Sequence, residues 1–365
     1  MSSRLRVLLV YAQSNLNATF SYQHAWPRHF CAHPRLACTP LNLADRRLRA
    51  RIEGPLTARF GQYDAIVLLH STFSNSCYLG GRLFDAIRRA PQPKAFFIGN
   101  EYKLMPEKMA FAEALGIALL VSQSSSPAVH DRYRQRLRCA VIGLPNTGLD
   151  SGLFFPRTAY ADRRIDLGYR SVPSPYYLGH NERERLAGFF ANHRNTGGLI
   201  VDVSLEAGDR FDEPGWAEFL NRCRGQLGTE AGGDYFELTD ETRLRVNAFL
   251  ETNQTATFQD VFDRFFATYE SPQPLRIISG RNIEAAGTRT VQILFEGHYD
   301  GYLHPGVHYI PLKKDLSNAA EAMLAFRDAD YAQRVANNAF ELAMTEFRYD
   351  VLIGKFHEAF APLVA

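Results

Sequence analysis

Short apolar runs alternate with stretches of helical spacing through the first half of the chain. Runs of four or five mostly apolar residues predict buried strands at residues 7–10, 65–69, 94–98, 118–121 and 139–143. Helices are predicted between them at residues 83–89, 106–115 and 128–137, and Pro106 and Gly116 suit the two ends of the second. Strands and helices that alternate in this way are typical of a parallel sheet covered on both faces. The first half is therefore predicted to be a Rossmann-like layer.

The second half repeats this alternation after a connection rich in proline and glycine, residues 144–156. Strands are predicted at residues 198–204, 275–279, 291–295 and 309–311, and helices at 214–224, 258–268 and 281–286. Asn318 and Glu321 have the spacing of a helix capping box. Further on, five apolar residues share one face of a final helix: Tyr349, Leu352, Ile353, Phe356 and Phe360. The pattern predicts an α/β protein of two Rossmann-like halves facing each other across a cleft.

Composition restricts the class of protein further. The chain has 365 residues, about enough for two domains, and 46% of them are hydrophobic. No apolar run approaches the ~20 residues that a membrane helix requires, and the short run near the N-terminus fits a first strand better than a signal peptide. The five cysteines are scattered without a Cys-x-x-Cys pair, which argues against a disulfide framework or a zinc site and favours the cytoplasm.

Charge is distributed unevenly along the chain. Residues 1–160 hold 20 Lys and Arg against 9 Asp and Glu, whereas residues 161–365 hold 21 against 30. One interpretation is an unevenly solvated surface, and the other is that the first half meets an anionic partner. The overall excess of +2 is too small to indicate nucleic acid, and no nucleic-acid-binding motif accompanies it.

Common catalytic motifs are missing from the sequence. No Gly-x-Gly-x-x-Gly follows the first predicted strand, which argues against a standard dinucleotide dehydrogenase. Walker loops, Gly-x-Ser-x-Gly elbows and His-Glu-x-x-His pairs do not occur either. His298, His304 and His308 resemble metal ligands in type, but the glycine and proline residues around them favour a loop.

Several blocks in the second half, taken together, resemble a known family. Residues 145–156 read Pro-Asn-Thr-Gly-Leu-Asp-x-x-x-Phe-x-Pro, and residues 281–287 read Arg-x-x-Glu-Ala-x-Gly. Residues 295–306 and the tail around residues 328–339 follow in the same order. These blocks are similar to GT-B glycosyltransferases of the large retaining group, with a tail similar to spore-maturation-type members. The resemblance covers residues 145–365, and the first half only by pattern.

This resemblance implies a domain organisation. Residues 1–156 would form a Rossmann-like acceptor domain, and residues 157–345 a Rossmann-like domain that binds the nucleotide-sugar donor. Residues 346–365 would form a closing helix that crosses back to the first domain.

The resemblance also implies a donor site. Glu284 matches the glutamate that binds the donor ribose, and Arg281, one turn earlier on the same helix face, could reach the diphosphate. Gly287, where the backbone can be approached closely, and Thr288 complete this segment. Alternatively, Glu284 and Arg281 are ordinary solvated helix residues.

Two further arginines enter the donor site by resemblance alone. Residues 168–170, Gly-Tyr-Arg, resemble the Gly-Arg after the first strand of the donor domain, so Arg170 would support the leaving diphosphate. Arg183 or Arg185 would supply the next cation, although both also suit a charged helix face.

Three residues are candidates for the catalytic step. Glu230 lies in a Gly-x-Glu-x-Gly segment that resembles one in the family's cleft, although a plain turn is the alternative. His70 and Glu101 each follow a buried strand, where α/β proteins place functional side chains. Glu101 could orient or deprotonate an acceptor hydroxyl, and His70 has a purely structural role as its alternative.

The chain departs from the family pattern at two places. Arg276 replaces the sugar-contacting glutamate expected eight positions before Glu284, so that glutamate is either missing or supplied from elsewhere, with Glu230 as the candidate. The paired glycines expected after the first strand are also missing.

The function expected from the resemblance is transfer of a sugar from a nucleotide-diphosphate sugar, such as a UDP-sugar, to an acceptor hydroxyl. We expect no metal ion or other cofactor, a retaining reaction and no nucleic-acid partner. An anionic or membrane-associated acceptor is hypothesised from the arginines of the first half, with a location in the cytoplasm or peripherally at the inner membrane. The alternatives are a nucleotide-sugar epimerase and a catalytically inactive binding subunit of the same fold.

Overall fold

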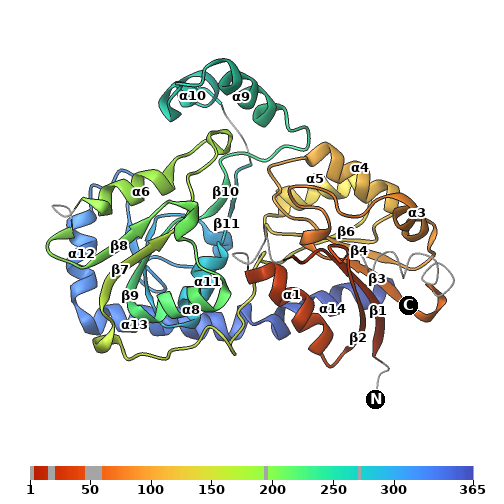
Figure 1. Cartoon of the computed structure of the whole chain (residues 1–365), viewed down its shortest axis with the longest axis horizontal. Coiled ribbons are helices and arrows are strands. Elements are labelled where there is room, and N and C mark those ends of the chain that lie inside the picture. The colour runs from red at the N-terminus through yellow and green to blue at the C-terminus, as the bar shows by residue number, and fades with distance from the viewer. Residues whose placement is uncertain (1–3, 15–20, 46–59, 193–195, 270–272, 365) are drawn as a thin grey trace. The chain divides into compact units, whose positions relative to one another are not determined.

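The computed structural model describes residues 4–14, 21–45, 60–192, 196–269 and 273–364, which belong to two compact units (Figure 1). Unit 1 comprises Met1–Gly148, Phe236–Asp240 and Tyr349–Ala365. Unit 2 comprises Leu149–Tyr235 and Glu241–Arg348. The chain therefore leaves unit 2 after Arg348, and its last helix belongs to unit 1.

Unit 1 contains a six-stranded parallel sheet in the order β2-β1-β3-β4-β5-β6. Its strands are β1 (Leu5–Tyr11), β2 (Leu36–Asn42), β3 (Ala65–Leu68), β4 (Lys94–Phe97), β5 (Leu119–Ser122) and β6 (Ala140–Gly143). The predicted apolar runs all form strands, and β2 is additional. The order of the strands reverses between β1 and β3, so the sheet is doubly wound.

The helices of unit 1 cover both faces of this sheet. They are α1 (Ser21–Ala32), α3 (Gly81–Arg89), α4 (Met105–Leu115), α5 (Pro127–Leu137) and α14 (Tyr349–Phe360). Helices α1 and α14 share one apolar cluster with the sheet, and the five predicted residues of α14 are all buried in it. On the other face, Phe96 of β4 packs against Phe111 of α4, with ring centroids 5.3 Å apart. As predicted, α4 has proline in its first turn and ends at Gly116, whose φ is 61°.

Unit 2 contains a five-stranded parallel sheet in the order β13-β12-β9-β7-β8. Its strands are β7 (Ile165–Arg170), β8 (Val201–Ser204), β9 (Cys223–Gly228), β12 (Val291–Phe295) and β13 (Ile310–Leu312). The order reverses between β7 and β9. In doubly wound sheets, ligands bind outside the carboxyl ends of the strands at such a reversal.

Two apolar clusters cover the two faces of the second sheet. Helices α8 (Glu213–Arg222) and α11 (Gly280–Gly287) contribute to one, and α6 (Glu182–Ala191) and α12 (Ala319–Arg327) to the other. Residues of α13 (Ala329–Leu342) belong to both. A short antiparallel pair, β10 (Ala231–Gly233) and β11 (Leu275–Ile277), flanks the insertion that holds α9 (Glu241–Thr252) and α10 (Phe258–Phe265).

Two local predictions were wrong. The helix predicted to reach residue 224 ends at Arg222, because Cys223 begins β9, a central strand without an apolar run. Asn318 does not cap α12 with its side chain. Its Oδ1 accepts from the Lys313 amide (2.8 Å) and its Nδ2 donates to the Pro311 carbonyl oxygen (3.1 Å), so it ties the turn between β13 and α12 instead.

The arrangement is that of an α/β protein with two Rossmann-like units, as predicted. Among the residues that the structure describes, no helix is both long and apolar enough to cross a membrane.

Candidate functional site

The carboxyl ends of β7 and β9 place polar residues at the strand-order reversal of unit 2. Ser171 follows β7, and Thr229 and Glu230 follow β9. Helix α11 brings Arg281 to the same edge, because the Arg281 guanidinium contacts the residues that end β7. This edge of unit 2 is the candidate site.

Arg281 is a partly buried cation that Glu284, one turn later on α11, attracts without forming an ion pair with it. Its Nη1 donates to the Arg170 carbonyl oxygen (2.9 Å) and to Ser171 Oγ (3.2 Å), and it has no ion pair within the described part of the chain. Burial lowers the pKa of Arg281 to about 10, and repulsion from Arg183 and Arg210 contributes. A guanidinium in these surroundings is stabilised when an anion binds.

Arg183 is a second cation of the same kind. It lies in the first turn of α6, where its Nη1 reaches the Val172 carbonyl oxygen at 3.5 Å and its Nε is buried without a partner. As far as the structure describes the chain, Arg183 has no ion pair either. Two neighbouring guanidiniums without carboxylates repel each other, so the pair favours an anionic ligand.

Glu284 lies one turn after Arg281 on α11 and is 3% exposed. Its Oε2 accepts a hydrogen bond of 2.8 Å from the indole Nε1 of Trp216, a residue of α8. The carboxylate is therefore held in one orientation from a second helix. Figure 1 shows α8 and α11 beside each other in unit 2.

The guanidinium of Arg170 already has a carboxylate partner. It is the last residue of β7, and its guanidinium forms an ion pair of 2.7 Å with Asp202 of β8. The same group lies 4.6 Å from the centroid of the Phe219 ring. Because Asp202 already neutralises its charge, we leave Arg170 out of the proposed diphosphate site.

Arg185, Gly287 and Thr288 also have other partners. Arg185 donates to the Lys314 carbonyl oxygen (2.6 Å). A side chain at Gly287 would collide with Leu149. The group that approaches the Gly287 backbone closely is therefore Leu149 of the same chain. The Thr288 hydroxyl is fully buried and donates to the Ala285 carbonyl oxygen (3.0 Å). We assign these residues to the stability of the unit.

Glu230 is a buried carboxylate at the end of β9. Its Oε1 accepts from the amides of His298 (2.9 Å) and Tyr299 (2.7 Å), which begin a short 3₁₀ turn. Burial raises the pKa of Glu230, and the hydrogen bond from Tyr299 opposes this. Gly297 leaves room for the carboxylate, because a side chain there would overlap it.

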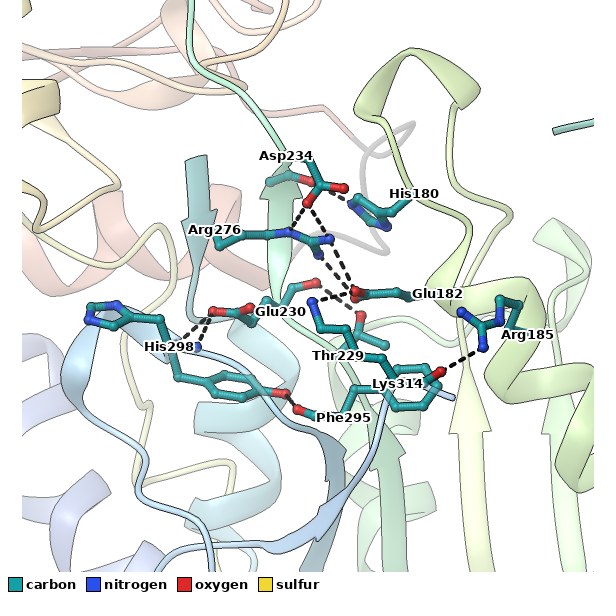
Figure 2. A network of polar contacts seen from close by, with 12 residues as sticks. His180, Glu182, Arg185, Thr229, Glu230, Asp234, Arg276, Phe295, His298 and Lys314 are labelled. Atoms are coloured by element: carbon teal, nitrogen blue, oxygen red, sulfur yellow. Dashed lines mark hydrogen bonds and ion pairs between the residues drawn. The ribbon is translucent and has the colours of Figure 1, made fainter. Parts of the chain in front are cut away.

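Beside Glu230, Arg276 and Glu182 form the centre of a charged network (Figure 2). The Arg276 guanidinium donates to both oxygens of Glu182 at 3.0 Å and pairs with Asp234 at 2.6 Å. Lys314 Nζ reaches Glu182 at 2.9 Å. Burial opposes ionisation of Glu182, but Arg276 and its cationic neighbours outweigh it and lower its pKa to about 2.

The remaining catalytic candidates, His70 and Glu101, are buried in unit 1. Burial lowers the pKa of His70 to about 3, so the ring is neutral, and it packs against Trp26 with ring centroids 5.8 Å apart. The Glu101 carboxylate accepts from Tyr133 Oη (2.6 Å), Ser122 Oγ (2.8 Å) and the Gln123 amide (2.5 Å). Such a set of donors orders the loop around Glu101, so we give Glu101 a structural role.

The loop histidines do not form a metal cluster. His304 donates its amide to His308 Nδ1 at 3.0 Å, which fits the predicted loop. No group of three potential metal-ligating side chains occurs in the part of the chain that the structure describes.

We compared the sequence and the structure of the chain with those of known proteins. No family model and no curated protein sequence matches the chain. The structure of HepE from Anabaena with UDP-glucose matches with a TM-score of 0.51 at 12% identity, over 98% of this chain and 100% of that chain. HepE with UDP gives a TM-score of 0.51 at 11% identity over the same shares. Sucrose-phosphate synthase from Thermosynechococcus elongatus gives 0.47 at 13% identity, over 99% of each chain.

The chain has the GT-B fold. At these sequence identities the comparison shows the fold alone. The assignment of the candidate site therefore depends on the contacts described above.

Sequence reasoning missed three residues of unit 2 that interact with residues at or near the candidate site: Trp216, Glu182 and Arg210. Trp216 lies 68 positions from its partner Glu284, and Glu182 lies 94 positions from Arg276. No local motif links such distant residues. A tryptophan on a short helix and an acidic residue in the first turn of α6 were therefore not distinctive in the sequence.

Proposed function

We propose that the chain is a glycosyltransferase that moves a sugar from a nucleoside-diphosphate sugar to an acceptor hydroxyl. The observation that carries this proposal is the pair of arginines at the strand-order reversal of unit 2, Arg281 and Arg183, which form no ion pair with any residue that the structure describes. A diphosphate supplies the negative charge that this pair lacks, and arginine donates to phosphate oxygens through two parallel hydrogen bonds.

In this proposal two residues of α11 bind different parts of the donor. Arg281 contacts the diphosphate and Glu284, one turn later, accepts the hydroxyl hydrogens of the ribose diol. The bond between the sugar's anomeric carbon and the diphosphate oxygen breaks, and its electron pair leaves with the diphosphate. A bond from the anomeric carbon to the acceptor oxygen forms, and the proton of the acceptor hydroxyl passes to the departing diphosphate. The arginines stabilise the charge that develops on the departing diphosphate. HepE, whose fold is similar, was crystallised with UDP and UDP-glucose, which supports uridine as the nucleoside.

Glu230 is the best candidate for contact with the transferred sugar. Two backbone amides hold its Oε1, and the carboxylate can accept further hydrogen bonds. At the position where the family resemblance predicts a sugar-contacting glutamate, Arg276 binds Glu182 and Asp234 instead. In our proposal Glu230 replaces that glutamate.

Other parts of the expected function remain proposals. We propose that the reaction retains the anomeric configuration, requires no metal ion and takes place in the cytoplasm, with the inner membrane as a possible surface of attachment. An anionic acceptor stays a hypothesis based on the arginines of the first half. These arginines form two clusters in the sequence, at residues 46–51 and 132–138, and the first lies outside the described residues. In the other, Arg134 pairs with Asp131 at 2.8 Å and Arg136 with Glu113 at 2.9 Å.

A donor-binding subunit without transferase activity is the second candidate. The observation in its favour is Arg276, which replaces the expected glutamate and is enclosed by two carboxylates.

Incubation of the protein with a panel of nucleotide sugars, followed by NMR of the products, tests these functions. Slow hydrolysis of one donor, or transfer to an added acceptor, supports the glycosyltransferase. An isomerised nucleotide sugar indicates an epimerase. Tight binding without turnover supports the binding subunit, and no binding of any nucleotide sugar contradicts the whole proposal.

A further inference from the structure

Trp216 contacts the candidate donor site in a way that its packing alone does not require. Its indole is 8% exposed and donates to the Glu284 carboxylate at 2.8 Å. Trp26 satisfies its own indole N–H with a backbone oxygen, that of Asn146, also at 2.8 Å. A buried indole thus needs only an acceptor, whereas Trp216 binds the one carboxylate of α11, which lies one turn after Arg281.

The indole of Trp216 is itself fixed by neighbouring rings. It stacks on Phe219 with the centroids 5.6 Å apart and the planes 21° apart. The guanidinium of Arg170 lies over the same Phe219 ring, and Arg170 is in turn held by Asp202. Because this series of contacts restricts the indole, the N–H of Trp216 points at Glu284 before any ligand arrives.

We infer that Trp216 is a positioning residue that orients Glu284 toward the ribose diol and so makes the site select ribonucleotides over deoxyribonucleotides. The inference rests on the proposed function. A carboxylate has room for about four hydrogen bonds, and the indole uses one of them. Ordering Glu284 in advance removes part of the conformational entropy that binding the diol would otherwise lose.

The test compares two matched variants, Trp216→Phe and Trp26→Phe. Each keeps an aromatic ring and deletes one indole N–H bond of the same length, and the second deletion lies in unit 1. Calorimetric titration measures the affinities for UDP and for 2′,3′-dideoxy-UDP, which lacks both hydroxyls. The ratio of the two affinities reports the contact with ribose and is not changed by a general loss of packing.

We expect wild-type protein to prefer UDP by about 10- to 100-fold, and Trp216→Phe to reduce this preference by about 3- to 10-fold. Trp26→Phe should keep the wild-type preference. An unchanged preference in folded Trp216→Phe overturns the inference and leaves the proposed function intact. A wild-type protein that binds neither nucleotide contradicts the proposed function itself. If it binds both equally, the ribose contact is absent and the inference fails with it.

A measurement on the wild-type protein covers the case in which Trp216→Phe does not fold. The chain has two tryptophans, so a ¹⁵N-labelled sample gives two indole N–H signals, which Trp26→Phe assigns. UDP should shift the Trp216 signal strongly, and dideoxy-UDP should shift it much less. Equal shifts with both nucleotides overturn the inference.

Discussion

Replacing Arg281 by glutamine should weaken nucleotide binding without destabilising the protein. The combination is unusual, because most substitutions of buried residues reduce stability. It follows from the surroundings of Arg281, a partly buried guanidinium next to Arg183 with no carboxylate partner among the described residues.

The expected magnitudes come from the contacts of the side chain. Burial, with repulsion from Arg183 and Arg210, lowers the pKa of Arg281 to about 10. After solvent screening of this partly buried side chain, the charged form destabilises the fold by about 1–3 kcal/mol at neutral pH. The variant also loses the hydrogen bonds to the Arg170 carbonyl and to Ser171, each contributing about 1 kcal/mol. The two effects nearly cancel, so the free energy of unfolding should stay within about 1 kcal/mol of wild type or increase slightly.

Nucleotide affinity should change far more. One charge-assisted hydrogen bond contributes about 1.5–3 kcal/mol, so the affinity for UDP should fall about 10- to 150-fold in Arg281→Gln. Calorimetric titration gives the affinity, and urea unfolding without ligand gives the stability.

Arg224→Gln is the matched control. Arg224 lies at the amino end of β9, at the opposite edge of the same sheet, and pairs with Asp166 at 3.0 Å. This control should lose a little stability and keep its affinity for UDP. If Arg281→Gln instead loses several kcal/mol of stability and binds UDP like wild type, the reasoning about an unneutralised cation is refuted.

The remaining predictions concern pH, metal ions and salt. Because ion pairs lower the pKa of Glu182 to about 2, they contribute stability that is complete above the ordinary carboxyl pKa and is lost as the pH falls toward 2. Urea unfolding between pH 5 and pH 2 should show a loss of stability in wild type that Glu182→Gln does not show. At pH 7 the variant should be less stable than wild type by about 3–5 kcal/mol, because Arg276 is left unpaired. Sugar transfer should be unaffected by EDTA, and an activity that EDTA removes and a divalent ion restores contradicts metal independence. Raising the salt concentration should weaken acceptor use more than donor binding, and equal sensitivity removes the reason for an anionic acceptor.

The elements that the sequence predicted well are those whose local pattern decides their structure. The fully buried strand β3 is a continuous apolar run, β12 is apolar except for Gln292, and α14 carries its apolar residues at helical spacing. Strand β9 could not be found in this way, because it contains Gly225 and Gln226 at buried or partly buried positions. Gly225 is needed there because a side chain would collide with Phe326, a contact made only in the folded unit.

In the candidate site, too, local relations could be predicted from the sequence and contacts between distant residues could not. Arg281 and Glu284 are separated by three positions on one helix, so their common face followed from the sequence. The ion pair of Arg170 could not be predicted, because its partner Asp202 comes from a neighbouring strand that the sequence does not connect to it. Trp216 was missed for the same reason, since its hydrogen bond joins two helices.

The binding of UDP to three proteins tests the central claim most directly: wild type, Glu284→Ala and Glu321→Ala. Glu321 is an exposed residue in the first turn of α12 and serves as the control. Loss of the ribose contacts, at about 1.5–3 kcal/mol, should weaken UDP binding about 10- to 150-fold in Glu284→Ala. Glu321→Ala should bind UDP like wild type. A folded Glu284→Ala protein with wild-type affinity for UDP would show that the donor does not bind at α11.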